Sequence, residues 1–114
     1  MDIDTSALFA PIVINGHTLK NRLSVAPMTR VTATQDGRAT ETMTRYYERF
    51  ARGGFGTVST EGIYTDQAFS QGYAHQPGMT DEAQAKAWEP AVSGIKAHGA
   101  LAIAQTMHAG ARHA

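Results

Sequence analysis

The sequence predicts an α/β fold in which a β-hairpin is followed by a β-α-β-α-β series of parallel strands. An Asn-Gly pair, Asn15-Gly16, separates two short strand-like runs near the start of the chain. Beyond it, short apolar runs alternate with two longer segments whose apolar residues recur at helical spacing. Alternation of this kind is typical of a parallel sheet with right-handed crossovers.

The hairpin is expected over residues 12–19. Ile12–Ile14 and His17–Leu19 are its two strands, and they flank the Asn-Gly pair. Asn-Gly is favoured in a two-residue type I′ turn because both central residues take a positive φ. We expect this hairpin to cap a core rather than to carry chemistry.

Residues 23–28 form the expected first strand of the sheet. Because proline cannot donate to a β-ladder, this strand should end at or just past Pro27. After a loop, Thr40 is a suitable N-cap for a helix that ends at Gly53-Gly54. The buried face of this helix is predicted from apolar residues at helical spacing: Met43, Tyr46, Tyr47, Phe50 and Ala51.

The second and third strands are expected at residues 56–61 and 101–107. Between them, Thr80 is a candidate N-cap for a second helix. Pro90 lies inside the helical pattern, where it would remove a hydrogen bond and clash with the preceding turn. The helix therefore either bends at Pro90 or consists of two pieces, the second starting near it.

Composition excludes several functional classes. Ten basic and ten acidic residues give a net charge of zero with histidine neutral, so neither a nucleic-acid footprint nor a polybasic membrane patch is expected. No apolar run approaches the roughly 20 residues of a membrane span, and the acidic start does not resemble an export signal. The absence of cysteine excludes thiol chemistry and fits a cytoplasmic location.

Three unusual stretches stand at the carboxyl ends of the predicted strands: residues 26–30, 60–62 and 105–110. Ligands of parallel α/β folds gather at this edge. In each stretch a small or rigid residue stands beside a hydrogen-bonding one. The backbone can then approach a flat ligand closely, while a hydroxyl or an amide hydrogen-bonds to the edge of that ligand. The alternative is that these are ordinary polar strand ends reaching water. His108 and His113 alone do not predict a metal site, and none is expected.

The same stretches carry a family resemblance. "LFAPIVINGHTLKNRLSVAPMTR", "TEGIYTDQAFSQGYAHQPGMTDEAQ" and "QTMHAG" resemble the opening of the Old Yellow Enzyme family of flavin oxidoreductases. The resemblance runs from Leu8 onward. It implies that residues 1–114 are the N-terminal segment of an FMN-binding TIM barrel: the first three βα-type strands of a (βα)8 barrel, preceded by the hairpin. One departure is Ala111, which separates Gly110 from Arg112 where the family often reads His-Ala-Gly-Arg.

The resemblance also implies cofactor contacts. Thr29 occupies the position whose hydroxyl bonds the flavin carbonyl at C4 and tunes the flavin. Gly62 falls where a small residue lets the flavin ring pack closely, and Gln105 matches the amide that reads its pyrimidine edge. The backbone that approaches the flavin would be that of Ala26, Pro27 and Met28. A hydroxyl and an amide side chain can hydrogen-bond to the carbonyl and imide groups along the edge of a flavin.

On the substrate side the resemblance implies three further residues: Tyr73, Met107 and His108. The implied cofactors are FMN and NAD(P)H as the reductant. The family's proton donor and phosphate anchor have no counterpart among these residues.

Length leads to two hypotheses. A TIM barrel needs about 250 residues, so 114 residues would form an incomplete barrel. In the first hypothesis the chain is the N-terminal part of an oxidoreductase that reduces activated alkenes, inactive alone, with an amine dehydrogenase or demethylase as a close variant. In the second, it is a non-catalytic fragment that self-associates as a homo-oligomer or complements another chain carrying the remaining strands.

Overall fold

The computed structural model describes residues 2–113. Ten short elements follow one another along the chain: α1 (Ser6–Phe9), β1 (Ile12–Ile14), β2 (His17–Leu19), β3 (Ser24–Val25), α2 (Glu41–Arg52), β4 (Thr57–Tyr64), α3 (Glu82–Ala87), α4 (Glu89–Ala97), β5 (Leu101–Met107) and the 3-10 turn η1 (Gly110–Arg112). β1 and β2 pair antiparallel around Asn15 and Gly16, whose φ angles of 48° and 80° are those that a type I′ turn requires.

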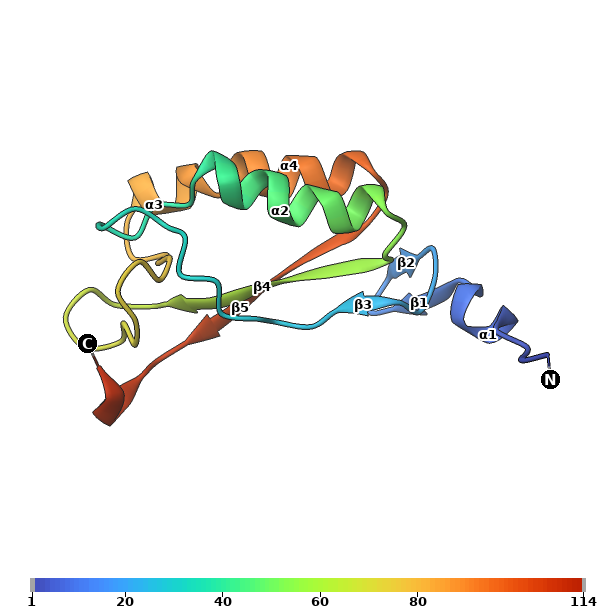
Figure 1. Ribbon diagram of the computed structural model, residues 1–114, viewed down its shortest axis with the longest axis horizontal. Coiled ribbons are helices and arrows are strands. Elements are labelled where there is room, and N and C mark those ends of the chain that lie inside the picture. The colour runs from blue at the N-terminus through green and yellow to red at the C-terminus, as the bar shows by residue number, and fades with distance from the viewer. Residues whose placement is uncertain (1, 114) are drawn as a thin grey trace.

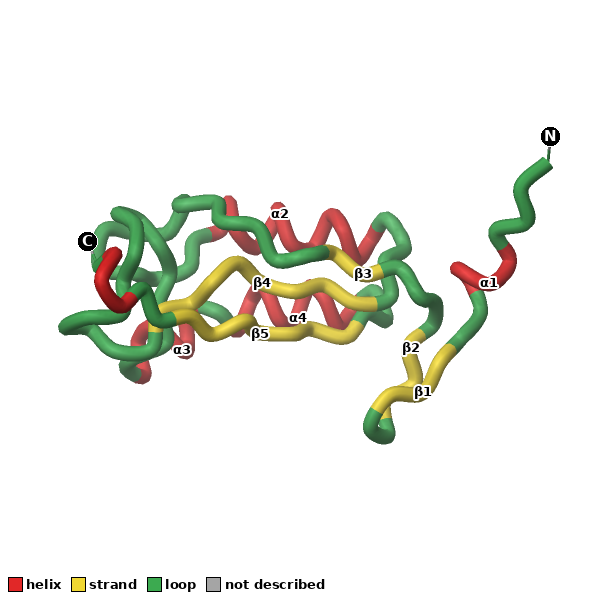
Figure 2. Tube along the Cα trace, turned by 90° about the horizontal axis from the view of Figure 1, so that it is seen from below, coloured by secondary structure: helices red, strands yellow, loops and turns green. Residues whose placement is uncertain are grey.

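The remaining strands form one parallel sheet in the order β3-β4-β5. α2 and α4 lie side by side across one face of this sheet (Figure 1). Figure 2 looks onto the opposite face, which no described helix covers. At the amino-terminal end of that open face, residues of the hairpin and of the three strands line an apolar pocket of about 300 Å³.

The core lies between the sheet and its helices. Val58 of β4 packs there with Met43 and Tyr47 of α2 and with Ala91 and Ile95 of α4. Thr40 accepts a hydrogen bond at its side chain from the backbone of Met43, so it caps α2 as the sequence predicts. In the part of the chain that the structure describes, no helix is long and apolar enough to cross a membrane.

Two strands differ from the predicted ranges of 23–28 and 56–61. β3 contains only Ser24 and Val25, because the chain leaves the ladder before Pro27, which has no N–H to donate. β4 continues past Glu61 to Tyr64, where it still pairs with β5. The register shifts between Ser59 and Gly62, so a bulge rather than a strand end accounts for the glycine. β5 occupies residues 101–107.

The second helical region consists of two helices. α3 ends at Ala87, and α4 carries Pro90 in its first turn, where a missing N–H costs no intrahelical bond. Asp81, rather than Thr80, is the N-cap of α3, and its carboxylate accepts from the backbone N–H of Gln84 at 2.8 Å. The hydroxyl of Thr80 donates instead to the side-chain oxygen of Gln84.

Candidate functional site

The three unusual stretches meet at one end of the sheet. Gly62 of β4 stands opposite Gln105 of β5, and the backbone N–H of Gln105 donates to the hydroxyl of Thr60 at 3.1 Å. On the other side of β4, the backbone N–H of Arg30 donates to the Glu61 carboxylate at 3.4 Å. Residues 26–30, 60–62 and 105–110 therefore form a continuous edge at the carboxyl ends of three neighbouring strands.

Thr29 and Gln105 each carry a hydrogen-bonding side chain at this edge. Both are exposed, as are Ala26, Pro27 and Met28. Within residues 2–113, neither the Thr29 hydroxyl nor the Gln105 carboxamide forms a hydrogen bond to another residue, whereas the backbone N–H of Gln105 does. A hydroxyl and a carboxamide that are free in this way fit the carbonyl and imide edge of a flavin.

Gly62 differs from this pattern because it is buried. A Cβ built on Gly62 would lie 2.6 Å from Sδ of Met107, closer than real Cβ contacts come. Its carbonyl accepts a hydrogen bond from the Gln76 carboxamide at 2.8 Å. A side chain at position 62 would therefore require Met107 to move.

Three other predicted residues are brought together beside Gly62. Tyr73, Met107 and His108 line one small pocket of about 150 Å³, which Arg112 also lines. His108 accepts from the backbone N–H of Gly110 at Nδ1, at 3.0 Å, and its Nε2 lies 3.2 Å from the Asp66 carboxylate. Since Nδ1 accepts, the ring proton belongs on Nε2, facing Asp66.

Glu61 and Tyr47 form a buried polar pair that the sequence reasoning did not single out. Tyr47 donates its O–H to Oε2 of Glu61 at 2.7 Å, and the Glu61 backbone N–H donates back to the same hydroxyl oxygen at 2.8 Å. Burial raises the pKa of the Glu61 carboxyl, an effect opposed by hydrogen bonds from Tyr47 and from the N–H groups of Arg30 and Val31. Burial, followed by the bond to Glu61, raises the pKa of Tyr47. A carboxylate within an apolar strand pattern was the signal that could have found this pair.

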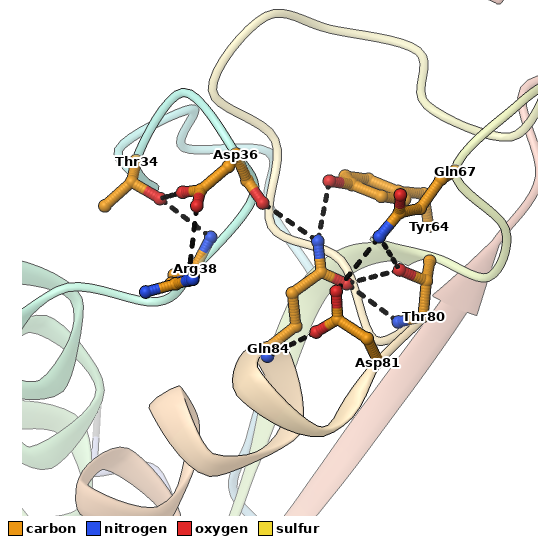
Figure 3. A network of polar contacts seen from close by, with 8 residues as sticks. All are labelled: Thr34, Asp36, Arg38, Tyr64, Gln67, Thr80, Asp81 and Gln84. Carbon is orange, nitrogen blue, oxygen red and sulfur yellow. Dashed lines mark hydrogen bonds and ion pairs between the residues drawn. The ribbon is translucent and has the colours of Figure 1, made fainter.

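A second polar network, shown in Figure 3, ties together the loops that surround the edge. At its centre is Gln84 of α3, which is 2% exposed. Its Nε2 donates to the Asp36 carbonyl and to the Tyr64 hydroxyl, each at 3.0 Å. Its Oε1 accepts from the backbone and hydroxyl of Thr80, each at 2.8 Å. One side chain thus links loop 32–38, the end of β4 and the start of α3.

Comparison with known proteins identifies relatives of the chain. The putative 12-oxophytodienoate reductase 11 of Oryza sativa subsp. japonica is 31% identical over 106 residues, which are 93% of this chain and 28% of that protein. Chanoclavine-I aldehyde reductase of Penicillium roqueforti is 33% identical over 86% of this chain and 26% of its own length. The chain therefore spans less than a third of these curated relatives.

Solved structures share the fold. The Old Yellow Enzyme homologue from Zymomonas mobilis is 36% identical and superposes with a TM-score of 0.82, covering 90% of this chain and 28% of the homologue. Old Yellow Enzyme from Pichia sp. AKU4542 is 31% identical with a TM-score of 0.88. Residues 7–114 match the sequence model of the NADH:flavin oxidoreductase / NADH oxidase family. The chain belongs to this family, as the motifs at its strand ends indicate.

Proposed function

We propose that this chain supplies the first three strands and one rim of the cofactor site of an FMN-dependent oxidoreductase. The observation that carries the proposal is the edge at which Thr29 and Gln105 present free polar side chains on either side of Gly62. Ligands of parallel α/β folds bind at this end of the sheet. The Thr29 hydroxyl and the Gln105 carboxamide would hydrogen-bond the flavin, and the exposed backbone of residues 26–28 would lie against it.

FMN, when bound, would supply hydride transfer between NAD(P)H and an activated alkene. The names of the rice and Penicillium relatives make them reductases, which supports the reductive direction. Tyr73, Met107 and His108 share a pocket, which supports a substrate-facing role for this group. Gly62 supports that pocket indirectly, since its lack of a side chain lets Met107 lie where it does.

The remaining strands of the barrel are the partner that this proposal requires. Within residues 2–113, β3 and β5 each have one neighbour in the sheet, so each has an edge open to a further strand. Ile103 of β5 is 41% exposed and lines the apolar pocket beneath the sheet. Strands from the rest of the same polypeptide, or from a complementing chain, would cover both the open edges of the sheet and the apolar pocket.

Replacing Thr29 by alanine tests the assignment at the cofactor. In a complete barrel, made by joining this chain to the remaining strands of the Zymomonas mobilis homologue, we expect T29A to shift the flavin reduction potential. A single neutral hydrogen bond corresponds to roughly 10–30 mV in a two-electron couple. We also expect one of the two half-reactions to slow in stopped-flow measurements, because the hydroxyl acts on the flavin itself.

Thr42→Ala provides the matched control, since Thr42 is exposed on α2 and is not one of the edge residues 26–30, 60–62 and 105–110. This variant should leave the potential and both half-reactions unchanged. If T29A and T42A give the same potential and the same rates, Thr29 does not contact the flavin and the proposed site is wrong.

A further inference from the structure

We propose that Glu61 is a positioning residue, which fixes the backbone of residues 26–31 and thereby the place of Thr29 at the site. That Thr29 faces a flavin rests on the proposed function. The fixing of the segment rests on contacts within this chain alone.

The segment needs an anchor because it has left the sheet. β3 ends at Val25, and residues 26–31 form no regular element and are exposed. Val31 has a φ of 49°, in the left-handed region that a β-branched residue rarely adopts. Such a conformation persists only when surrounding contacts hold it.

Glu61 provides that anchor from the neighbouring strand. Its Oε1 accepts from the Arg30 backbone at 3.4 Å, and the N–H of Val31 also contributes to the stabilisation of its charge. The guanidinium of Arg30 lies 5.1 Å from the centre of the Tyr46 ring. Since Tyr46 and Tyr47 are consecutive on α2, this helix holds Arg30 twice: directly at its side chain, and at its backbone through Glu61.

The Glu61 carboxylate is buried, which indicates that its role is to bind the groups that hydrogen-bond to it. Glu61 is 1% exposed, and an unpaired charge at such a place is costly. If stability were the only requirement, an apolar residue could occupy this position, because apolar residues of similar volume often replace buried ionic groups with no loss of stability. The bulge of β4 between Ser59 and Gly62 includes Glu61, and bulges re-aim side chains. The Glu61 carboxylate, whose direction the bulge changes, connects Tyr47 to residues 26–31.

Amide hydrogen exchange, measured by NMR on the 114-residue chain, tests this role without any cofactor. In Glu61→Gln the side chain loses its charge, so the hydrogen bond that it accepts from the Arg30 N–H becomes a weaker, neutral one. We expect the Arg30 amide to exchange at least roughly tenfold faster, as expected when a hydrogen bond to a charged group is weakened. The core amides of α2 and β4 should keep their wild-type rates.

Two further variants separate positioning from general support. Tyr47→Phe does not touch the segment, yet it removes the hydroxyl that orients Glu61, so it should also speed exchange at Arg30. The double variant should be no faster at Arg30 than E61Q alone, because both changes act through one chain of contacts. Glu48→Gln, which alters a half-buried carboxylate that contacts His98, should leave Arg30 and Val31 unchanged.

Uniformly faster exchange through α2 and β4 in E61Q would assign Glu61 to general core support and overturn the proposal. Unchanged exchange at Arg30 in both E61Q and Y47F would overturn it as well. Should E61Q fail to fold, Y47F against E48Q decides the question by the same comparison.

An FMN titration of the same samples ties the segment to the site. We expect FMN to shift the Thr29 amide resonance in the wild type and to shift it less in E61Q. Equal Thr29 shifts in the two proteins would overturn the positioning role. If FMN shifts neither protein while E61Q still frees Arg30, the anchoring by Glu61 is upheld and the flavin assignment is the part that fails.

Discussion

Replacing Tyr47 by alanine should destabilise the fold by at least about 4 kcal/mol, the largest effect we expect from a single substitution. Truncating a buried aromatic side chain costs about 3–5 kcal/mol. Tyr47 is 1% exposed, and its ring lies 5.0 Å from that of Tyr46 and 5.9 Å from that of Trp88. The change also removes the hydroxyl that donates to the buried Glu61 carboxylate. Small domains have only about 5–15 kcal/mol of stability, so Y47A should be largely unfolded in mild denaturant.

Urea unfolding followed by fluorescence measures this effect, because Trp88 is the only tryptophan in the sequence and is buried near Tyr47. Tyr47→Phe keeps the ring and should lose about 1–3 kcal/mol, the cost of leaving a buried polar group unsatisfied. Tyr73→Ala is the matched control, since Tyr73 is 39% exposed and should lose less than about 1 kcal/mol. Equal midpoints for Y47A and Y73A would contradict the description of the core.

Replacing Gln84 by alanine should cost about 2–4 kcal/mol and loosen the loops around the site. The variant loses all four hydrogen bonds of the carboxamide at once and leaves the Asp36 carbonyl and the Thr80 N–H without their partner. Loop 32–38 includes Arg38, whose peptide bond trypsin can cleave when the loop opens. We therefore expect faster cleavage at Arg38 in native buffer, together with a lower urea midpoint.

Gln71→Ala is the matched control for this prediction. Gln71, from the segment between β4 and α3, lines the same pocket as Arg38 and Gln84, and its carboxamide donates to the Tyr73 carbonyl at 2.9 Å. Its loss should change stability by less than about 1 kcal/mol and leave cleavage at Arg38 at the wild-type rate. Cleavage at Arg38 that is equally fast in Q84A and Q71A would show that Gln84 does not hold the loops.

Much of the fold was predictable because local rules determine its elements. The Asn15-Gly16 turn, the Thr40 cap and the apolar stripe of α2 each depend on a few neighbouring residues, and the structure contains all of them. The bounds of β3 and β4 were wrong because they depend on tertiary contacts. β3 stops after Val25, before Pro27, and the chain beyond it contacts Glu61 instead of a ladder partner, whereas β4 continues because β5 pairs with it beyond the bulge.

The site was predictable only in outline. Strand order placed residues 26–30, 60–62 and 105–110 at one edge, and the structure brings them together. The hydrogen-bonding roles of Glu61 and Gln84 could not be read from spacing, because Tyr47 lies 14 residues from Glu61 and Asp36 lies 48 residues from Gln84 in sequence. A charged residue inside a strand pattern does indicate that a partner must exist, but it does not say which one.

A residue-resolved titration of the chain with FMN tests whether the carboxyl ends of β3, β4 and β5 form a flavin-binding edge. We expect weak, roughly millimolar binding that shifts the amide resonances of Met28, Thr29 and Gln105. Riboflavin should give the same pattern, because the proposed contacts are all to the flavin ring. Shifts confined to the hairpin at residues 12–19, or no shifts at millimolar FMN, would contradict the claim.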